Sequence, residues 1–240
     1  MSINKAFNMM FNHRYDDDNT LKYFTVNDFK DLQAEEVEFL TNDNNKLRGY
    51  LYSSTNYKEY KALLVLSHGL GAGHLQYTTE INYFAQQGYL VLGFDNTGCN
   101  LSEGKGINCL TYSVLDLKAA LEYVSGNEKI NKLPILLYGH SLGAFAVCNV
   151  TEICDVKISG IVALAPFINE IANIYDRFTE VLKRKVSLIK FVLTRKLHKK
   201  LKGNEKLNTI NSLLNSDVPH LIISGALDQT VDYHKNFLKM

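Results

Sequence analysis

The chain has 240 residues, of which 46% are hydrophobic and 21% charged, and its formal net charge is +1. This length suits one domain, or one domain with a modest insertion, whose core needs neither disulfides nor a metal. So small a net charge gives no reason to expect binding to nucleic acid or to an acidic surface.

Neither a secretory signal nor a membrane span is expected. Residues 1–18 contain no apolar run long enough for a signal peptide, because polar residues interrupt every short apolar group. No stretch approaches the roughly 18–20 apolar residues that a membrane-spanning helix needs. The four cysteines, at positions 99, 109, 148 and 154, show no CxxC spacing and are interpreted as reduced structural thiols. Together these features favour a cytoplasmic protein.

The predicted elements begin after a polar, aromatic-rich lead-in, residues 1–34. Two strands joined by a turn-rich segment are predicted to pair as an antiparallel hairpin, and short apolar runs then alternate with helical patterns. The hairpin strands are residues 37–40 and 47–52, the later strands 63–66, 89–94, 135–138, 158–164 and 220–224, and the helices 77–87, 111–124 and 142–153. Continuously apolar strands separated by helices indicate a mostly parallel sheet covered on both faces, so the predicted fold class is α/β.

Residues 169–210 interrupt this alternation, since they carry no strand signal and eleven Lys or Arg against four Asp or Glu. Their apolar residues recur at helical spacing, which predicts one long or two shorter amphipathic helices. We therefore expect a lead-in (1–34), a core (35–168 and 211–240) and a helical cap inserted between strands (169–210). The cap either covers the sheet edge with solvated lysines or makes weak surface contact with anionic lipid or an acidic substrate.

A pentapeptide of the form Gly-x-Ser-x-Gly, residues 139–143, joins a predicted strand to a predicted helix. The motif needs this context, because its serine sits on a sharp turn in a strained backbone conformation and both neighbours must be small. The free N–H groups at the start of the helix then point at the same spot. Ser141 is therefore the candidate nucleophile, and a purely structural glycine-rich turn is the alternative.

Acyl transfer builds negative charge on a carbonyl oxygen, which two preorganised backbone N–H groups can stabilise by several kcal/mol. One donor is expected at Leu142, directly after the serine. The other is expected at Leu70, in the glycine-rich loop 67–73 that follows a predicted strand. His68 lies in the same loop but precedes the serine, so we interpret it as a brace for the loop.

Asp228 is the candidate triad acid, because the chain order in this kind of site is Ser, then Asp or Glu, then His. It ends a turn after the predicted strand 220–224, where a carboxylate can orient an imidazole and stabilise the imidazolium that forms. A loop or helix-capping carboxylate before Thr230 and Val231 is the alternative. Asp95 also follows a strand, but it precedes the serine and is interpreted as a turn former.

With these residues in view, the chain resembles the α/β-hydrolase superfamily, in particular its monoacylglycerol-lipase-like and serine-aminopeptidase-like branch. The resemblance runs from about residue 35 to the last residue and rests on residues 68–69, 88–89, 94–104, 139–143 and 224–231. It implies a mostly parallel central sheet with helices on both faces and a helical cap. Cys99-Asn100 departs from the family pattern, which commonly has a small residue or Gly at these positions.

The larger departure is at the end of the chain. Family members continue past the acid with a helix, an eighth strand and a loop that bears the catalytic histidine, whereas this chain ends twelve residues after Asp228. His234 follows the acid, but we expect it in a helix (231–238) that leads away from the serine. The C-terminal strand and histidine loop are thus expected to be missing, which would leave residues 220–224 as an unprotected sheet edge that favours self-association.

Three interpretations of this end remain open: a truncated piece of an active hydrolase, a chain completed by another chain, or a hydrolase-derived binding protein without turnover. The function expected is a serine hydrolase that acts on a small-molecule carboxylic ester or acyl substrate, inactive as this chain if it lacks the base that serine needs. The alternatives are a non-catalytic binding protein and a serine aminopeptidase-like peptidase, which the basic cap disfavours. No cofactor, metal or nucleic acid is expected to bind.

Overall fold

The computed structural model describes residues 3–182 and 187–231 of the chain. In these residues seven strands form one sheet in the order β1-β2-β4-β3-β5-β6-β7. The strands are β1 (Leu32–Leu40), β2 (Lys46–Ser54), β3 (Leu63–Ser67), β4 (Leu90–Phe94), β5 (Ile135–His140), β6 (Gly160–Leu164) and β7 (His220–Ile223). The helices are α1 (Ile3–Phe11), α2 (Thr78–Gln86), α3 (Tyr112–Gly126), α4 (Leu142–Asn149), α5 (Glu170–Leu182), α6 (Ser187–Leu201) and α7 (Thr209–Leu214).

The sheet is mixed at one side and parallel at the other. β1 pairs antiparallel with β2, as the hairpin prediction requires, and β2 also pairs antiparallel with β4. From β4 onward all neighbouring strands run parallel, so their carboxyl ends meet at one edge of the sheet. β1 begins at Leu32, inside the expected lead-in, because its pairing with β2 extends from Leu32 opposite Ser54 to Leu40 opposite Lys46.

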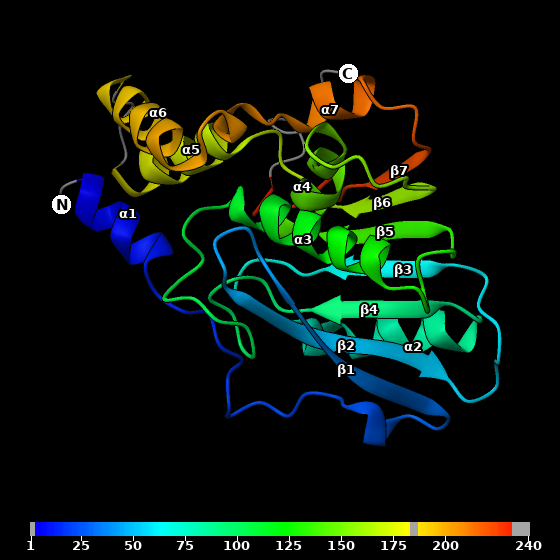
Figure 1. Ribbon diagram of the computed structural model, residues 1–240. Helices are drawn as coiled ribbons and strands as arrows, with labels where there is room; N and C mark the ends of the chain where they lie inside the picture. Colours follow the sequence, from blue (N-terminus) through cyan, green and yellow to red (C-terminus); the bar gives the residue numbers. More distant parts are fainter. Residues whose placement is uncertain (1–2, 183–186, 232–240) are drawn as a thin grey trace.

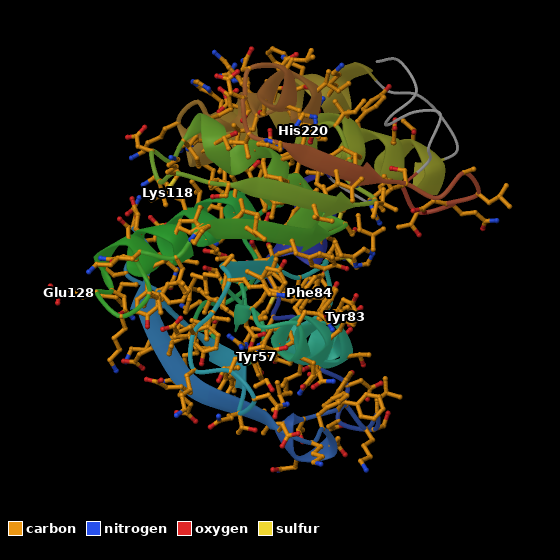
Figure 2. The ribbon with its side chains drawn as sticks, turned by 90° about the vertical axis from the view of Figure 1, so that its right-hand side faces the viewer. Tyr57, Tyr83, Phe84, Lys118, Glu128 and His220 are labelled. Carbon is orange, nitrogen blue, oxygen red and sulfur yellow. The ribbon has the colours of Figure 1, made fainter. Side chains whose placement is uncertain are left out.

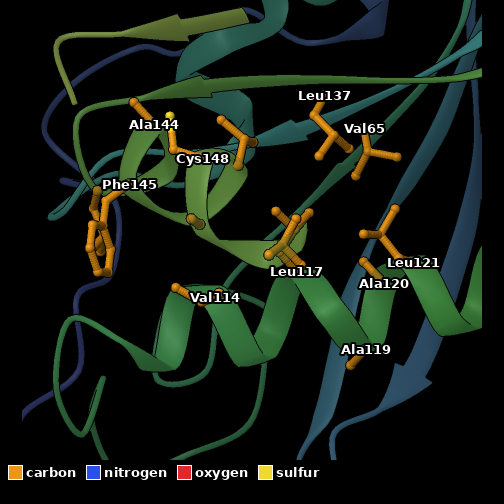
Figure 3. Close-up of a cluster of buried hydrophobic side chains, with 14 of the residues drawn as sticks. Val65, Val114, Leu117, Ala119, Ala120, Leu121, Leu137, Ala144, Phe145 and Cys148 are labelled. Atoms are coloured by element: carbon orange, nitrogen blue, oxygen red, sulfur yellow. The ribbon is translucent and has the colours of Figure 1, made fainter. Parts of the chain in front are cut away.

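Two apolar layers flank the sheet, as the continuously apolar strands predict. Side chains alternate between faces along a strand, so Val65 of β3 packs toward α3 and α4 while Leu64 and Leu66 pack toward α2. Figure 1 shows α3 and α4 over one face and α2 over the other. Figure 3 shows the first layer, in which Leu117 and Leu121 of α3 approach β3 and β5.

The described residues of the segment expected to be a cap contain no strand and are mostly helical, with α5 and α6 followed by a short 3₁₀ turn (Asn204–Lys206) and the start of α7. Figure 1 places α5 and α6, together with α1 of the lead-in, beyond the carboxyl ends of the parallel strands. Phe7 of α1 is 1% exposed and receives the ammonium group of Lys196 over its ring at 4.0 Å. The lead-in and the cap are therefore packed together.

Candidate active site

Ser141 lies on the sharp turn between β5 and α4, at the carboxyl edge of the sheet. Its backbone has φ 54° and ψ −109°, a region that non-glycine residues rarely adopt and that stores strain. Two hydrogen bonds hold this conformation: the Ser141 N–H donates to the Leu164 carbonyl at 2.8 Å, and the Phe145 N–H donates to the Ser141 carbonyl at 3.0 Å. The side chain is half-buried rather than enclosed in the core.

The glycines on either side of Ser141 are required by close backbone contacts. A Cβ at Gly139 would overlap the carbonyl group of Gly143, and a Cβ at Gly143 would overlap the carbonyl group of Ser67 at the end of β3. α4 therefore starts directly against the neighbouring strand, a position that only glycine permits. This is the spatial reason for the two glycines of the pentapeptide.

The loop after β3 is tied to this turn by Tyr77, a residue that the sequence analysis did not identify. The Gly69 N–H donates to the Tyr77 hydroxyl at 3.0 Å, and the same hydroxyl lies 2.8 Å from Nδ1 of His140. Burial raises the pKa of Tyr77 to about 12, opposed by the Gly69 N–H, so the phenol stays protonated and donates to His140. No sequence motif marks Tyr77, because its partners lie eight and 63 positions away.

Leu70 and Leu142 line the same small hollow, of about 10 Å³, at this edge. In the described ranges, neither backbone N–H of these two residues has a hydrogen-bond acceptor. For Leu142 this follows from its place in the first turn of α4, where N–H groups have no partner within the helix. Leu70 and Leu142 thus line one hollow, and Leu142 directly follows Ser141.

His68 braces the loop, as expected. The imidazole is 1% exposed; its Nε2 accepts the Asn96 N–H at 2.9 Å, and Nδ1 lies 2.8 Å from the Gly69 carbonyl. Because Nε2 accepts, Nδ1 carries the proton and donates to that carbonyl. Burial lowers the pKa of His68 and keeps the ring neutral.

Asp95 likewise makes hydrogen bonds that stabilise the local backbone. Its Oδ1 accepts the backbone N–H of His74 at 2.9 Å and lies 2.8 Å from Nδ1 of the His74 imidazole. Its Oδ2 accepts the Leu101 N–H at 3.2 Å. Burial alone would raise the pKa of Asp95, but His74 and its hydrogen bonds hold the pKa below its ordinary value. The carboxylate fixes the course of the loop after β4, which agrees with a turn former.

Asp228 follows β7 in a tight turn closed by its own N–H, which donates to the Gly225 carbonyl at 3.1 Å. Its Oδ1 accepts the N–H groups of Thr230 at 2.8 Å and Val231 at 2.9 Å. Asp228 thus has the capping geometry that the sequence analysis gave as the alternative to a triad role. Capping uses only Oδ1, and Oδ2 has no hydrogen-bond donor among the described residues. The two roles are therefore compatible.

The carboxylate of Asp228 influences the pKa of His140, in the serine turn. Burial lowers the pKa of His140, the residue before Ser141, and the carboxylates of Asp228 and Glu80 oppose that shift. Within the described ranges, no histidine is hydrogen-bonded to Ser141 or to Asp228. His234, which we had considered for that role, lies outside the described residues.

A larger hollow, of about 700 Å³, lies at the opposite edge of the sheet, around Lys118, Pro134, Ile135 and Ser159. Figure 2 looks at this edge, where Lys118 and the first residue of β7, His220, are labelled. The hollow lies where β5 and β6 begin, whereas Ser141 follows the end of β5. A choice of candidate site by the volume of the hollow alone would therefore select the edge of the sheet opposite to Ser141.

The four cysteines are unpaired thiols, and Cys99 and Cys109 border the small hollow beside Leu142. Burial raises the pKa of both thiols, so they remain protonated and weakly nucleophilic. In the described ranges, no group of three His, Cys, Asp or Glu side chains is placed to hold a metal ion. No helix of the described residues is both long enough and apolar enough to cross a membrane.

Solved structures with the same architecture include an esterase and a protein described as an α/β hydrolase. An esterase from Pyrococcus furiosus matches with a TM-score of 0.67 and 22% identity, over 90% of this chain and 78% of that one. The α/β hydrolase GrgF from Penicillium sp. sh18 matches with a TM-score of 0.61 and 18% identity, over 85% and 83% of the two chains. At these identities the likeness shows the fold.

Two curated relatives match by sequence. The quorum-quenching protein AidA of Acinetobacter baumannii is 30% identical over 135 residues, which is 55% of this chain and 43% of the relative. The polyketide transferase af380 of Aspergillus fumigatus is 28% identical over 141 residues, 58% of this chain and 47% of the relative. The chain thus spans less than half the length of either relative.

A family model described as serine aminopeptidase, S33, matches residues 58–217, a segment that contains both the loop after β3 and the turn at Ser141. The match covers 160 of the 240 residues. With this match and the shared architecture, the chain belongs to the serine aminopeptidase S33 family of α/β-fold hydrolases.

Proposed function

We propose that this protein is a serine acyl hydrolase that cleaves carboxylic esters through an acyl-enzyme on Ser141. The observation that carries the proposal is the strained backbone of Ser141 at the amino end of α4. Leu142, which directly follows the serine, and Leu70 have unpaired N–H groups among the described residues and line one small hollow. Such strain persists where the surrounding structure over-determines it, and it clusters at reactive sites. Membership in a hydrolase family agrees with this assignment.

In the proposed reaction the Ser141 hydroxyl oxygen attacks the ester carbonyl carbon and transfers its proton to a base. The carbonyl oxygen becomes an oxyanion that accepts hydrogen bonds from Leu70 and Leu142, worth about 3–4 kcal/mol for each donor in comparable sites. Collapse breaks the bond to the alcohol, which leaves with the proton from the base. Water then attacks the carbonyl carbon of the acyl-serine and gives a proton to the same base. The bond to the Ser141 oxygen breaks, that oxygen takes the proton from the base, and the carboxylic acid is released.

Asp228 is assigned as the acid that orients this base. Its Oδ1 is held by two backbone N–H groups, which fixes the carboxylate, and its Oδ2 is available to accept the N–H of an imidazole. Full turnover requires an imidazole between Ser141 and Asp228. Ester turnover by the chain is therefore the quantity to measure first.

An ester substrate is favoured over a peptide with a free amino terminus. A site for an ammonium group needs unpaired carboxylates near the serine, but two carboxylates of the cap are already occupied. Glu170 accepts hydrogen bonds from Leu110 and Thr111, and Glu205 lies 2.6 Å from Nδ1 of His198. The exposed side chains of α6 include Lys190, Arg195 and Lys199, which would repel an ammonium group.

The experiment is covalent labelling with a fluorophosphonate probe, followed by peptide mass spectrometry and by p-nitrophenyl ester turnover. We expect the adduct on Ser141, and Ser141→Ala should abolish both labelling and turnover. Ser125→Ala, at an exposed position near the end of α3, is the matched control and should leave both unchanged.

Labelling that survives in Ser141→Ala would remove this serine from the mechanism. Ligand binding without labelling or turnover would favour the non-catalytic binding protein. Faster cleavage of aminoacyl p-nitroanilides than of esters would favour a peptidase.

A further inference from the structure

Residues 14–17 of the lead-in lie along the loop 98–104 that follows β4. The Arg14 guanidinium donates to three carbonyls of that loop, those of Asn100 at 2.6 Å, Ser102 at 3.0 Å and Gly104 at 2.9 Å. A planar guanidinium presents its donors in a fixed geometry, so three acceptors from one loop fix the loop's shape as well as its position. We name residues 14–17 the strap.

Main-chain hydrogen bonds join the strap to the same loop. Tyr15 forms an isolated parallel bridge with Cys99, in which the Tyr15 N–H donates to Gly98 at 2.9 Å and the Asn100 N–H donates to Tyr15 at 3.3 Å. The Asp17 N–H donates to the side-chain oxygen of Asn100 at 2.6 Å. Cys99 and Asn100, where the chain departs from the family pattern, are thus the residues onto which the strap docks.

The strap also reaches the loop 69–73, which carries the Leu70 N–H. The ring of Tyr15 lies 3.6 Å from the point where a Cβ would stand on Gly71, and the Gln76 side chain donates to Asp17 at 2.8 Å. The Asn100 side chain fills the space beside Gly73, since a Cβ there would overlap its amide nitrogen. Figure 1 shows the lead-in running from α1 past the loops at this end of the sheet.

The loop 69–73 has little support of its own. Three of its five residues are glycines, and Gly71 has φ 75°. Inside the loop one backbone hydrogen bond is formed, from the Ala72 N–H to the Gly69 carbonyl at 3.3 Å. A segment with few internal hydrogen bonds and flexible residues depends on neighbouring elements for a single conformation.

Tyr15 is also connected to α1, which packs against α6 through Phe7 and Lys196. Burial and the nearby Cys99 raise the pKa of Tyr15, and the guanidinium of Arg177 in α5 opposes that shift. The phenol hydroxyl donates to the Met10 carbonyl at 3.1 Å, which continues the connection to α1. The ring is thus held between the loop at Gly71 and the elements that cover the carboxyl edge.

We infer that the strap is a positioning segment for acyl transfer: Tyr15 directly, and Arg14 through the loop 98–104 whose Asn100 contacts Gly73, hold the loop 69–73 so that the Leu70 N–H faces the developing oxyanion. This inference rests on the proposed function for its effect on rate. Its structural part, that the strap orders the loop, stands independently. The strap lies outside residues 58–217, which the family model matches.

The test compares Tyr15→Ala with Tyr57→Ala. Tyr57 is the matched control because its ring packs against another glycine with positive φ, Gly88, at the opposite edge of the sheet (Figure 2). We expect Tyr15→Ala to lower kcat per fluorophosphonate-labelled site by about tenfold with little change in KM, because a loosened donor weakens transition-state binding. Tyr57→Ala should keep the wild-type kcat per labelled site, and Tyr15→Phe, which keeps the ring, should recover most of the rate lost in Tyr15→Ala.

Hydrogen exchange of the amides in residues 69–73 is the second measurement, and it needs no turnover. Tyr15→Ala and Arg14→Gln should each speed exchange in that segment by at least about tenfold relative to the wild type, whereas Tyr57→Ala should not. Unchanged exchange at 69–73 in both strap variants would overturn the inference. If the wild type shows no labelling and no turnover, the proposed function fails, and the exchange result still decides whether the strap orders the loop.

Discussion

The two sides of the candidate site are supported in different ways. On the serine side, every residue of α4 is buried, and Phe145 stacks on Phe167 with ring centroids 4.4 Å apart. On the acid side, Leu221 is 55% exposed and Leu227 is 92% exposed. The serine turn is therefore fixed by the core, whereas the Asp228 turn is fixed by its own hydrogen bonds. Substitutions of buried residues on the first side should lower the free energy of unfolding, whereas substitutions on the second side should leave it almost unchanged.

The largest expected effect is on the acid side and concerns rate. Where the chain turns over esters with an imidazole as base, Asp228→Asn should lower kcat for ester hydrolysis by about a thousandfold or more, because an amide cannot stabilise an imidazolium as a carboxylate does. The amide oxygen can still accept the N–H groups of Thr230 and Val231, so the free energy of unfolding should change by less than about 0.5 kcal/mol. Steady-state kinetics and urea unfolding measure the two quantities. Asp155→Asn, an exposed carboxylate at the other edge, is the control; a similar loss of rate in both variants would contradict the assignment.

Phe145→Ala should lower the free energy of unfolding by about 3–5 kcal/mol, because it removes a fully buried ring and leaves a cavity against Phe167. Leu227→Ala removes an apolar side chain of similar size on the acid side and should cost less than about 0.5 kcal/mol. Urea denaturation followed by circular dichroism measures both. Equal losses would mean that the two sides share one core after all.

Gly143→Ala should destabilise the protein by about 3 kcal/mol, since the added methyl group meets the Ser67 carbonyl and the backbone must shift. Gly225→Ala is the matched change on the acid side. There the new Cβ would lie 3.7 Å from the nearest atom, Cβ of Asp228, so an effect below about 0.5 kcal/mol is expected. Urea unfolding measures both variants. A change in the free energy of unfolding of Gly143→Ala as small as that of Gly225→Ala would show that α4 can move away from β3.

The smallest expected effect is a pH dependence on the serine side. Burial raises the pKa of Asp116 from 3.8 to about 7, opposed by hydrogen bonds from Thr97 to both carboxylate oxygens. Between these two pH values the folded protein binds more protons than the unfolded chain, so this group's contribution to stability falls as pH rises toward 7. The free energy of unfolding should therefore decrease less between pH 5 and pH 8 in Asp116→Asn than in the wild type, by on the order of 1–2 kcal/mol. Urea unfolding at the two pH values measures this, and parallel curves for wild type and variant would contradict it.

Much of the sheet could be predicted from sequence, because buried parallel strands are short, apolar and bounded by turns. The predicted strand 135–138 and the pentapeptide after it correspond to β5 and the turn at Ser141. The strand 37–40 was predicted too short, because polar residues such as Glu35 and Glu36 obscure a strand whose length is set by pairing with β2. Helix 77–87 begins instead as a 3₁₀ turn at His74, which Asp95 holds from another loop.

The contacts around the site were less predictable, since they join residues far apart in the chain. Arg14 reaches carbonyls 86 to 90 positions away, and Tyr77 reaches His140 across 63 positions. Every residue type has a backbone carbonyl that can accept such a hydrogen bond. The amino-acid sequence therefore does not indicate which residues accept the hydrogen bonds of Arg14. Asn100 was visible only as a departure from the family pattern, and its hydrogen bond from Asp17 supplies the physical reason.

The atoms that exclude a side chain at positions 139 and 143 belong to the main chain. A compensating replacement elsewhere could shorten a crowding side chain, but no replacement can shorten a peptide group. Combinatorial libraries built to change the substrate range of this protein should therefore keep both glycines constant.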